Sequence, residues 1–170
     1  MLRKFDKLID SVGLLDLFDY PFKSDDLILL ESDYSRKLLS TLQNSCDTSK
    51  QVSALRFGHT LIDETGAGHI ASALQSPHCT LHKIQFVNNE IGPDGAMIIA
   101  EGLKMNTTLT TLEIIDDDIA AFGARALAEV LQQNQVLSSL TLQNNSITCG
   151  SGIDCISDAL RMNTTLRVLE

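Results

Sequence analysis

The stretch LHKIQFVNNEIGPDGAMIIAEGLKMNTT, residues 81–108, decides the fold of this chain because its pattern returns twice more with different letters. Leu109 and Leu137 open the next two copies and Leu166 begins a further one, so that the opening leucines lie 28, 28 and 29 residues apart. A fixed period of this length predicts a solenoid, in which each unit buries its apolar face against its neighbours.

Each unit changes its hydrophobic spacing halfway along. Leu81, Ile84 and Phe86 follow the spacing L-x-x-L-x-L. Together with Asn89 at the end, this spacing predicts a short strand whose alternate residues face inward. From 91 to 103 a small or apolar residue stands at every fourth position, which predicts one face of a helix. The corresponding positions in the next two copies are Leu112, Ile114, Asp117, Ile119, Gly123, Leu127 and Leu131, and Leu140, Leu142, Asn145, Ile147, Gly152, Ile156 and Leu160.

The chain resembles the leucine-rich repeat family, in the ribonuclease-inhibitor-like type found in NOD-like receptors. The resemblance rests on the L-x-x-L-x-L-x-x-N frames, the small glycines between strand and helix, and the Asn-Thr-Thr-Leu sequence at 106–109 and 163–166. It implies an α/β solenoid shaped as a right-handed horseshoe, with a parallel β-sheet inside on the concave face and helices outside. It also implies partner binding more often than catalysis.

The predicted units lie at 52–80, 81–108, 109–136 and 137–165, with a partial unit at 166–170. The first unit is degenerate and carries Thr60 at the asparagine position. Residues 1–51 are predicted to form a helical N-terminal cap, because apolar residues recur at helical spacing in 2–12 and 34–42 and such helices would cover an open apolar end. An independent N-terminal interaction helix is the alternative.

The last predicted strand, Leu166–Glu170, has no helix and no polar cap after it. An uncapped terminal unit exposes a strand edge and the apolar side of the preceding helix. We therefore expect either a truncated chain or an end that is used for self-association.

Composition narrows the class of partner. The chain has 170 residues, a net charge of −9 and no run of basic residues longer than two, which argues against nucleic acid because that affinity comes largely from Lys and Arg at phosphates. Asp6 and Asp10 interrupt any apolar run at the start, so neither a signal peptide nor a membrane span is expected. The four cysteines form no C-x-x-C pair, which fits a reduced, cytoplasmic location. Secretion into a host cell as an effector stays an alternative, since it would leave no readable mark.

The sequence contains no motif typical of catalysis, cofactor binding or metal binding. Asp116–Asp118 lack the D-x-D-x-D-G spacing of a calcium loop. His78, Cys79 and His82 straddle a predicted helix end and strand start and have no fourth ligand, so zinc is not expected. We expect no enzymatic activity, no cofactor and no metal.

Asp117 breaks the polar pattern at the strand ends. Asn89 and Asn145 can both donate to and accept from backbone groups of the bend, whereas an ionised carboxylate only accepts. A buried Asp117 would leave a backbone carbonyl without its donor, at a cost on the order of 1–3 kcal/mol. Asp117→Asn is therefore predicted to stabilise the domain.

The outward residues between the strand leucines form the predicted binding surface, because they stack in columns across the sheet. Val87 beside Ile115 would be an exposed apolar pair with polar flanks, which suits a small binding hot spot. A solvated face with incidental aliphatic residues is the alternative. The predicted partner-binding residues belong to three columns: Arg56, Gln85, Glu113 and Thr141 in the first, which Glu170 continues, Val87, Ile115 and Gln143 in the second, and His59, Asn88, Asp116 and Asn144 in the third.

These patterns predict a non-catalytic module that recognises a protein partner, of unknown identity, through the concave face. A recognition segment of a larger receptor or of a secreted bacterial effector is the alternative. A GTPase-activating accessory is a weaker alternative, because an arginine finger would need an Arg on a loop and the predicted strand-to-helix turns contain none.

Overall fold

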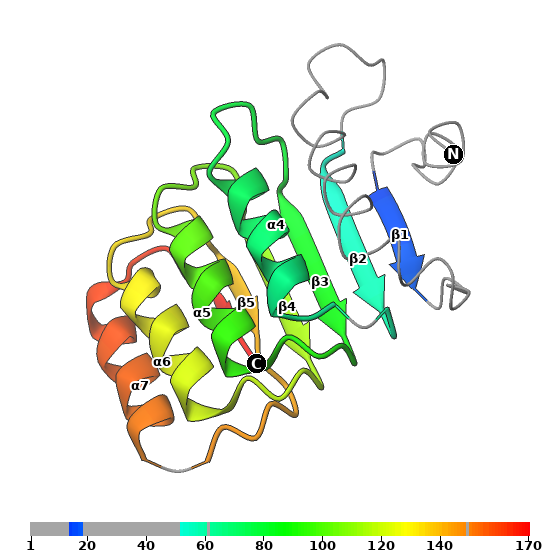
Figure 1. The fold of residues 1–170 in the computed structure, drawn as a ribbon. Helices are drawn as coiled ribbons and strands as arrows, with labels where there is room; N and C mark the ends of the chain where they lie inside the picture. Colours follow the sequence, from blue (N-terminus) through cyan, green and yellow to red (C-terminus); the bar gives the residue numbers. More distant parts are fainter. Residues whose placement is uncertain (1–13, 19–51, 61, 149) are drawn as a thin grey trace, which may run out of the picture.

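The computed structural model describes residues 14–18, 52–60, 62–148 and 150–170 (Figure 1). These residues form two layers, a six-stranded parallel sheet and a row of helices that covers one face of it (Figure 1). The strands are β1 (Leu14–Phe18), β2 (Ala54–Gly58), β3 (Lys83–Val87), β4 (Thr111–Ile115), β5 (Ser139–Thr141) and β6 (Val168–Leu169). The helices are α4 (Glu64–Leu74), α5 (Gly92–Leu103), α6 (Ala120–Leu131) and α7 (Ser151–Met162).

The strands lie in the sheet in the order of the chain, so each helix from α4 to α7 connects two neighbouring parallel strands. The register pairs Leu55 with Ile84, Ile84 with Leu112 and Leu112 with Leu140. These four side chains are buried and face the helices. The predicted α/β class, with strands and helices in alternation and a parallel sheet, is confirmed.

The core between the layers is mostly aliphatic, with one aromatic contact. The rings of Phe57 and Phe86 stack with centroids 5.5 Å apart and both side chains are fully buried. Burial of a side chain of this size contributes about 1.5–3 kcal/mol, so the stacked pair anchors β2 to β3.

Small residues set the distance between the helices. A Cβ atom added to Gly102 of α5 would lie 2.7 Å from the Cα atom of Ala71 in α4, and one added to Gly123 of α6 would lie 2.7 Å from the Cβ atom of Ala96. Gly123 lies inside α6, on the helix face that the sequence predicted, and the lack of a side chain there permits close helix packing.

Strand β1 was not predicted, and it lies within the segment predicted as a helical cap. It pairs in parallel with β2, from Leu14 opposite Ala54 to Phe18 opposite Gly58. Val12, Leu15 and Leu17 have the L-x-x-L-x-L spacing of the other strands, so the sequence carried a signal for this element that the prediction of a helical cap did not use. The helices predicted in 2–12 and 34–42 lie outside the described residues.

Across the described ranges, no helix combines the length and the apolar character that crossing a membrane requires.

Candidate functional site

The face of the sheet that carries no helices, here called the open sheet face, presents the predicted columns. The register sets Arg56 beside Gln85, Gln85 beside Glu113 and Glu113 beside Thr141. Glu170 follows Thr141 in the next strand, because its backbone N–H donates to the carbonyl of Leu140, 3.1 Å away. The first predicted column is therefore continuous across the sheet.

Glu113 is already engaged within this column. Its Oε2 atom accepts a hydrogen bond from Nε2 of Gln85, and its Oε1 atom pairs with Nζ of Lys83. Lys83 was not among the predicted site residues, although the alternation of the strand would have placed it outward, next to the inward Ile84. The carboxylate of Glu113 is thus already bonded to two neighbouring side chains of the sheet, so it is less available to a partner.

Thr141 differs from its prediction, because it is only 7% exposed. Its short side chain lies between Glu113 on one side and Glu170 on the other, and both of these are longer. Thr141 therefore offers little surface to a partner.

Val87 and Ile115 lie directly opposite each other in β3 and β4, as predicted. They are partly buried rather than exposed, because each covers part of the other. Gly58 occupies the same position in β2 and adds no side chain beside Val87. The pair forms a shallow apolar strip at the ends of the strands, and Gln143 lies exposed at the corresponding place after β5.

A row of exposed residues in the left-handed backbone conformation borders this strip. His59, Asn88, Asp116 and Asn144 have φ of 52°, 53°, 56° and 57° and form the third predicted column. The N–H groups of His59, Asn88 and Asp116 donate to carbonyls of the following strand at 2.9–3.1 Å. Asn and Asp tolerate this conformation better than most residues, which explains three of the four identities. We call these four residues the strand-end row.

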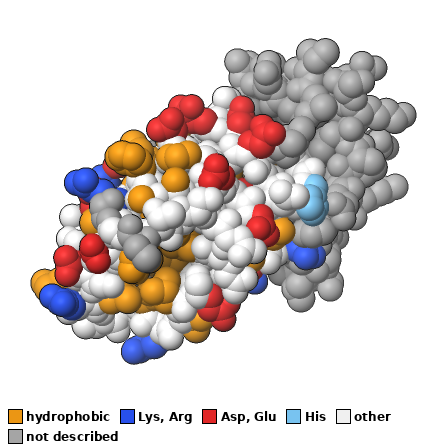
Figure 2. Space-filling model, turned by 90° about the horizontal axis from the view of Figure 1, so that it is seen from below, with side chains coloured by type: hydrophobic (Ala, Val, Ile, Leu, Met, Phe, Trp, Pro, Cys, Tyr) orange, Lys and Arg blue, Asp and Glu red, His pale blue; other side chains and the backbone are white. Residues whose placement is uncertain are grey.

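Two members of the strand-end row contact each other, since Nδ2 of Asn88 lies 2.6 Å from Nδ1 of His59. Figure 2 views the molecule from below, from the end where the strands finish, and shows acidic side chains spread over it. Asp63, Glu90 and Asp118 lie exposed in the turns beside the row. Neither Lys nor Arg occurs in 59–63, 88–92, 116–120 or 144–148, so this edge favours a basic partner.

A buried ladder of side chains lies beneath the strand-end row and links successive turns. Oδ1 of Asn89 accepts from N–H and Oγ1 of Thr60, at 3.1 and 2.9 Å. The N–H of Asn89 donates to Oδ1 of Asp117 at 2.9 Å, and the N–H of Asp117 donates to Oδ1 of Asn145 at 3.0 Å. We call these four residues the strand-end ladder.

Asp117 is the irregular member of the strand-end ladder. It is 1% exposed, and its Oδ2 atom is buried without a hydrogen-bond partner. Burial raises the pKa of the carboxyl from 3.8 to about 6, against hydrogen bonds from Asn89 and the backbone of Ile115, while the charge of Asp116 adds to the rise. The predicted misfit of a carboxylate at this position is therefore present.

A second ladder connects the helix ends to the next strands. Oδ1 of Asn134 accepts from the N–H groups of Val136 and Leu137, and its Nδ2 donates to the carbonyls of Leu103 and Asn106. Asn106 and Asn163 make the same kinds of bond one unit before and after. The recurrent Asn-Thr-Thr-Leu did not by itself indicate this role, but asparagine at three equivalent positions, 106, 134 and 163, could have revealed it. We call these asparagines the helix-end ladder.

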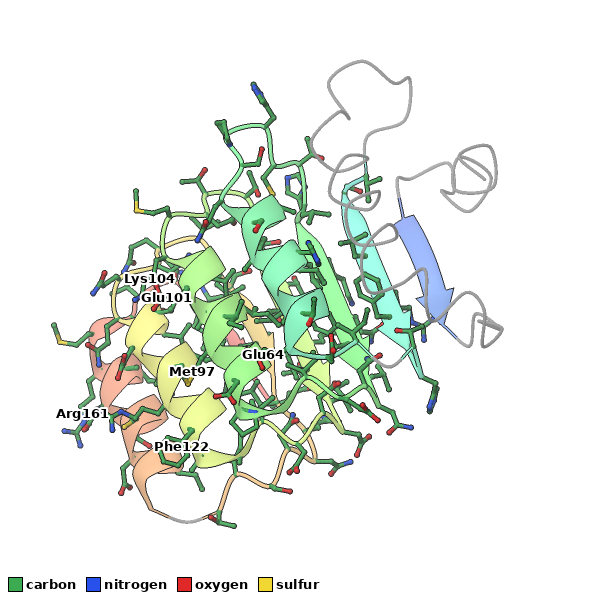
Figure 3. All side chains as sticks on the ribbon, viewed as in Figure 1. Glu64, Met97, Glu101, Lys104, Phe122 and Arg161 are labelled. Carbon is green, nitrogen blue, oxygen red and sulfur yellow. The ribbon has the colours of Figure 1, made fainter. Side chains whose placement is uncertain are left out.

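The helix layer also carries exposed apolar side chains, which are Met97 of α5, Phe122 of α6 and Ile153, Leu160 and Met162 of α7. Met97 of α5 and Phe122 of α6 lie away from the open sheet face, and Phe122 is 72% exposed (Figure 3). In the part of the chain that the structure describes, no three His, Cys, Asp or Glu side chains are grouped so that they could hold a metal ion. The sulfur of Cys79 instead accepts a hydrogen bond from Oγ1 of Thr108.

Comparison with known proteins gives a structural likeness. No family model matches the chain, and no curated protein matches it. A solved structure described as leiomodin-1 actin-binding site 2 is similar, with a TM-score of 0.67 and 26% sequence identity. The likeness covers 78% of this chain and 76% of that one. It therefore extends over most of the two-layer fold.

Proposed function

We propose that this chain is a leucine-rich repeat protein of the ribonuclease-inhibitor-like type, which acts without catalysis by binding a protein partner. The proposed surface is the open sheet face, as the concave side of a right-handed horseshoe, together with the strand-end row. Side-chain hydrogen bonds that recur at separations of 28 and 29 residues support the repeat assignment.

The observation that carries the proposal is the apolar strip of Val87 and Ile115 beside the exposed strand-end row. A partner that covers these aliphatic groups removes their remaining apolar area from water, and the polar row around them supplies hydrogen bonds and charge at the rim. The helix layer is the competing surface, because Met97, Phe122 and Met162 are exposed there.

Actin is the first partner to test. The similar structure is described as an actin-binding site, and its likeness to this chain covers about three quarters of both. The measurements are co-sedimentation with filamentous actin and fluorescence anisotropy with labelled monomeric actin. Absence of binding to both forms would leave a protein partner of another kind.

The surface is tested by Val87→Asp with Ile115→Asp, measured by affinity capture from lysate and by the actin assays. We expect loss of partner binding. The matched control is Met97→Asp with Phe122→Asp, which introduces two acidic residues at exposed apolar positions of the helix layer.

Circular dichroism must show that both double variants are folded, because Val87 and Ile115 are partly buried. Asp116→Lys supplies a third variant that leaves the apolar strip intact and reverses a charge of the strand-end row. Equal partner recovery by all variants would contradict the proposed surface.

A second candidate function is recognition within a larger receptor or secreted effector, with the activity in another domain. A second candidate surface is β6, where Val168 and Leu169 are exposed and could support self-association. Light scattering after size-exclusion chromatography distinguishes a monomer from a dimer and therefore separates this surface from the open sheet face. The cytoplasm is the proposed location, to be tested by imaging of the tagged protein.

A further inference from the structure

The position of Asp117 can be compared directly with the two asparagines on either side of it in the strand-end ladder. Nδ2 of Asn89 donates to the carbonyls of Phe57 and Val87, at 3.3 Å each. Nδ2 of Asn145 donates to the carbonyls of Ile114 and Gln143, at 2.6 and 3.0 Å. Both asparagines therefore supply a donor that holds the ends of two adjacent strands together.

Asp117 has no such donor while it is ionised. The register of β3 with β4 places the carbonyls of Phe86 and Ile115 at the corresponding positions for this residue. The Oδ2 atom on that side is buried and has no hydrogen-bond partner. An ionised Oδ2 therefore supplies no donor where the two asparagines supply one, and its burial without a partner is unfavourable for the folded state.

We propose that Asp117 acts as a proton-operated clasp between the strand–helix unit of β4 and α6 and the unit before it. One proton taken up from solvent on Oδ2 converts this oxygen into a donor and supplies one of the two bonds that Asn89 makes permanently. Oδ1 keeps its role, because it accepts from the N–H of Asn89 whether or not Oδ2 is protonated. Loss of that proton removes the Oδ2 hydrogen bond between the two units.

Few other charges surround the clasp. Asp116 and Asp118 lie on the same turn and Glu90 lies on the turn before it, and all three are exposed. The turn after β5, residues 144–148, contains no titratable side chain. No cation therefore stands in the neighbouring turns to hold Asp117 ionised, and the charge of Asp116 favours protonation.

The direction of the pH effect follows from the raised pKa. The carboxyl has a pKa of about 6 in the folded chain, against an ordinary value of 3.8. The bound proton therefore stabilises the fold fully below the ordinary value, and this contribution is lost as the pH rises through about 6. The Oδ2 hydrogen bond therefore forms on mild acidification, whereas a carboxylate whose pKa is lowered by an ion pair loses its contribution as the pH falls.

The test compares urea unfolding of the wild type and Asp117→Asn at several pH values. The unfolding equilibrium of the wild type should become about tenfold less favourable, relative to that of the variant, between about pH 7.5 and about pH 5. Asp118→Asn is the matched control, because it removes an exposed carboxylate of the same turn, tolerates the positive φ of 49° at that position and leaves the ladder intact, so it should retain the pH dependence of the wild type.

The carboxyl carbon of Asp117 should be titrated by NMR in the wild-type chain, which keeps the proposal testable if Asp117→Asn fails to fold. A midpoint well above the ordinary aspartate value supports the clasp. A midpoint at the ordinary value, or parallel unfolding profiles for the wild type and Asp117→Asn, would overturn it.

Discussion

Both side-chain ladders link neighbouring strand–helix units by hydrogen bonds, but they differ in the residue types that occupy them. In the helix-end ladder, all three described members, Asn106, Asn134 and Asn163, are asparagine and make equivalent bonds. The strand-end ladder contains Thr60 and Asp117 besides its two asparagines. Asparagines at both positions use the amide nitrogen and oxygen on backbone groups. The oxygen of Asn134 accepts from two N–H groups, of Val136 and Leu137, whereas the oxygen of Asn145 accepts from the N–H of Asp117 in the unit before it. A hydroxyl or a carboxylate can therefore enter the strand-end ladder, each with a defined loss.

The largest expected effect is at the helix-end ladder. Asn134→Ala removes four hydrogen bonds and leaves buried partners such as the carbonyl of Leu103 unpaired. We expect a loss of about 3–5 kcal/mol in the free energy of unfolding, from several unmade bonds of about 1 kcal/mol and the desolvation they leave. Urea denaturation measures it.

Gln135→Ala is the control for this substitution, because Gln135 is adjacent and exposed. Its Oε1 atom accepts only from Thr164, another exposed residue. A loss of similar size in both variants would show that the ladder bonds stabilise the fold no more than an exposed hydrogen bond does.

The second prediction concerns a carboxylate placed at another position of the strand-end ladder. Asn145→Asp keeps the acceptor for the N–H of Asp117 but removes the donor to the carbonyls of Ile114 and Gln143. We expect a loss of about 1–3 kcal/mol at neutral pH, part of which returns on acidification when the new carboxyl is protonated. Denaturation of Asn145→Asp that does not depend on pH would contradict the comparison.

Thr60, the first residue of the strand-end ladder, should be less sensitive to substitution than Asn145. Thr60→Val removes only the hydroxyl that donates to Oδ1 of Asn89 at 2.9 Å and leaves the backbone bond to the same oxygen in place. The expected cost is about 1 kcal/mol, observed as a small fall in the thermal midpoint. Thr60→Ser, which keeps the hydroxyl, serves as the control.

The smallest effect is expected outside both ladders, on the open sheet face. Lys83→Met removes the ion pair with Glu113 but keeps a long side chain over the sheet. Lys83 is 46% exposed, so the loss should be below about 1 kcal/mol and should shrink further at high salt. A loss as large as that of Asn145→Asp would place the exposed face, rather than the ladders, at the centre of stability.

Much of the described fold could be predicted from local spacing. The alternation of strand and helix follows from the change in apolar spacing, which begins anew at Leu81, Leu109 and Leu137. The same alternation fixed the columns of the open sheet face and placed Asp117 inward, where its missing donor could be foreseen. These predictions succeed because adjacent units impose the same environment on equivalent residues.

The failures share a different cause, which is that they depend on neighbours distant in sequence. Strand β1 pairs with β2 across about forty residues, outside the period of 28 and 29, so the matching spacing of Leu15 and Leu17 was passed over. Thr141 is buried by longer neighbours in other strands. The partner-binding role of the predicted surface stays a prediction.

The spacing of the ladder bonds also bears on how such a chain can change its length. The bonds across the strand-end ladder join residues 28 and 29 positions apart, and each turn contacts only the turns beside it. Excision of residues 109–136 as one block would bring Asn145 against Asn89 and restore an all-amide junction, with the aspartate removed along with its block. Deletion of a whole block is therefore expected to keep the hydrogen bonds of the strand-end ladder. An insertion of a few residues within a block would instead separate the ladder residue of that block from its partner in the next unit.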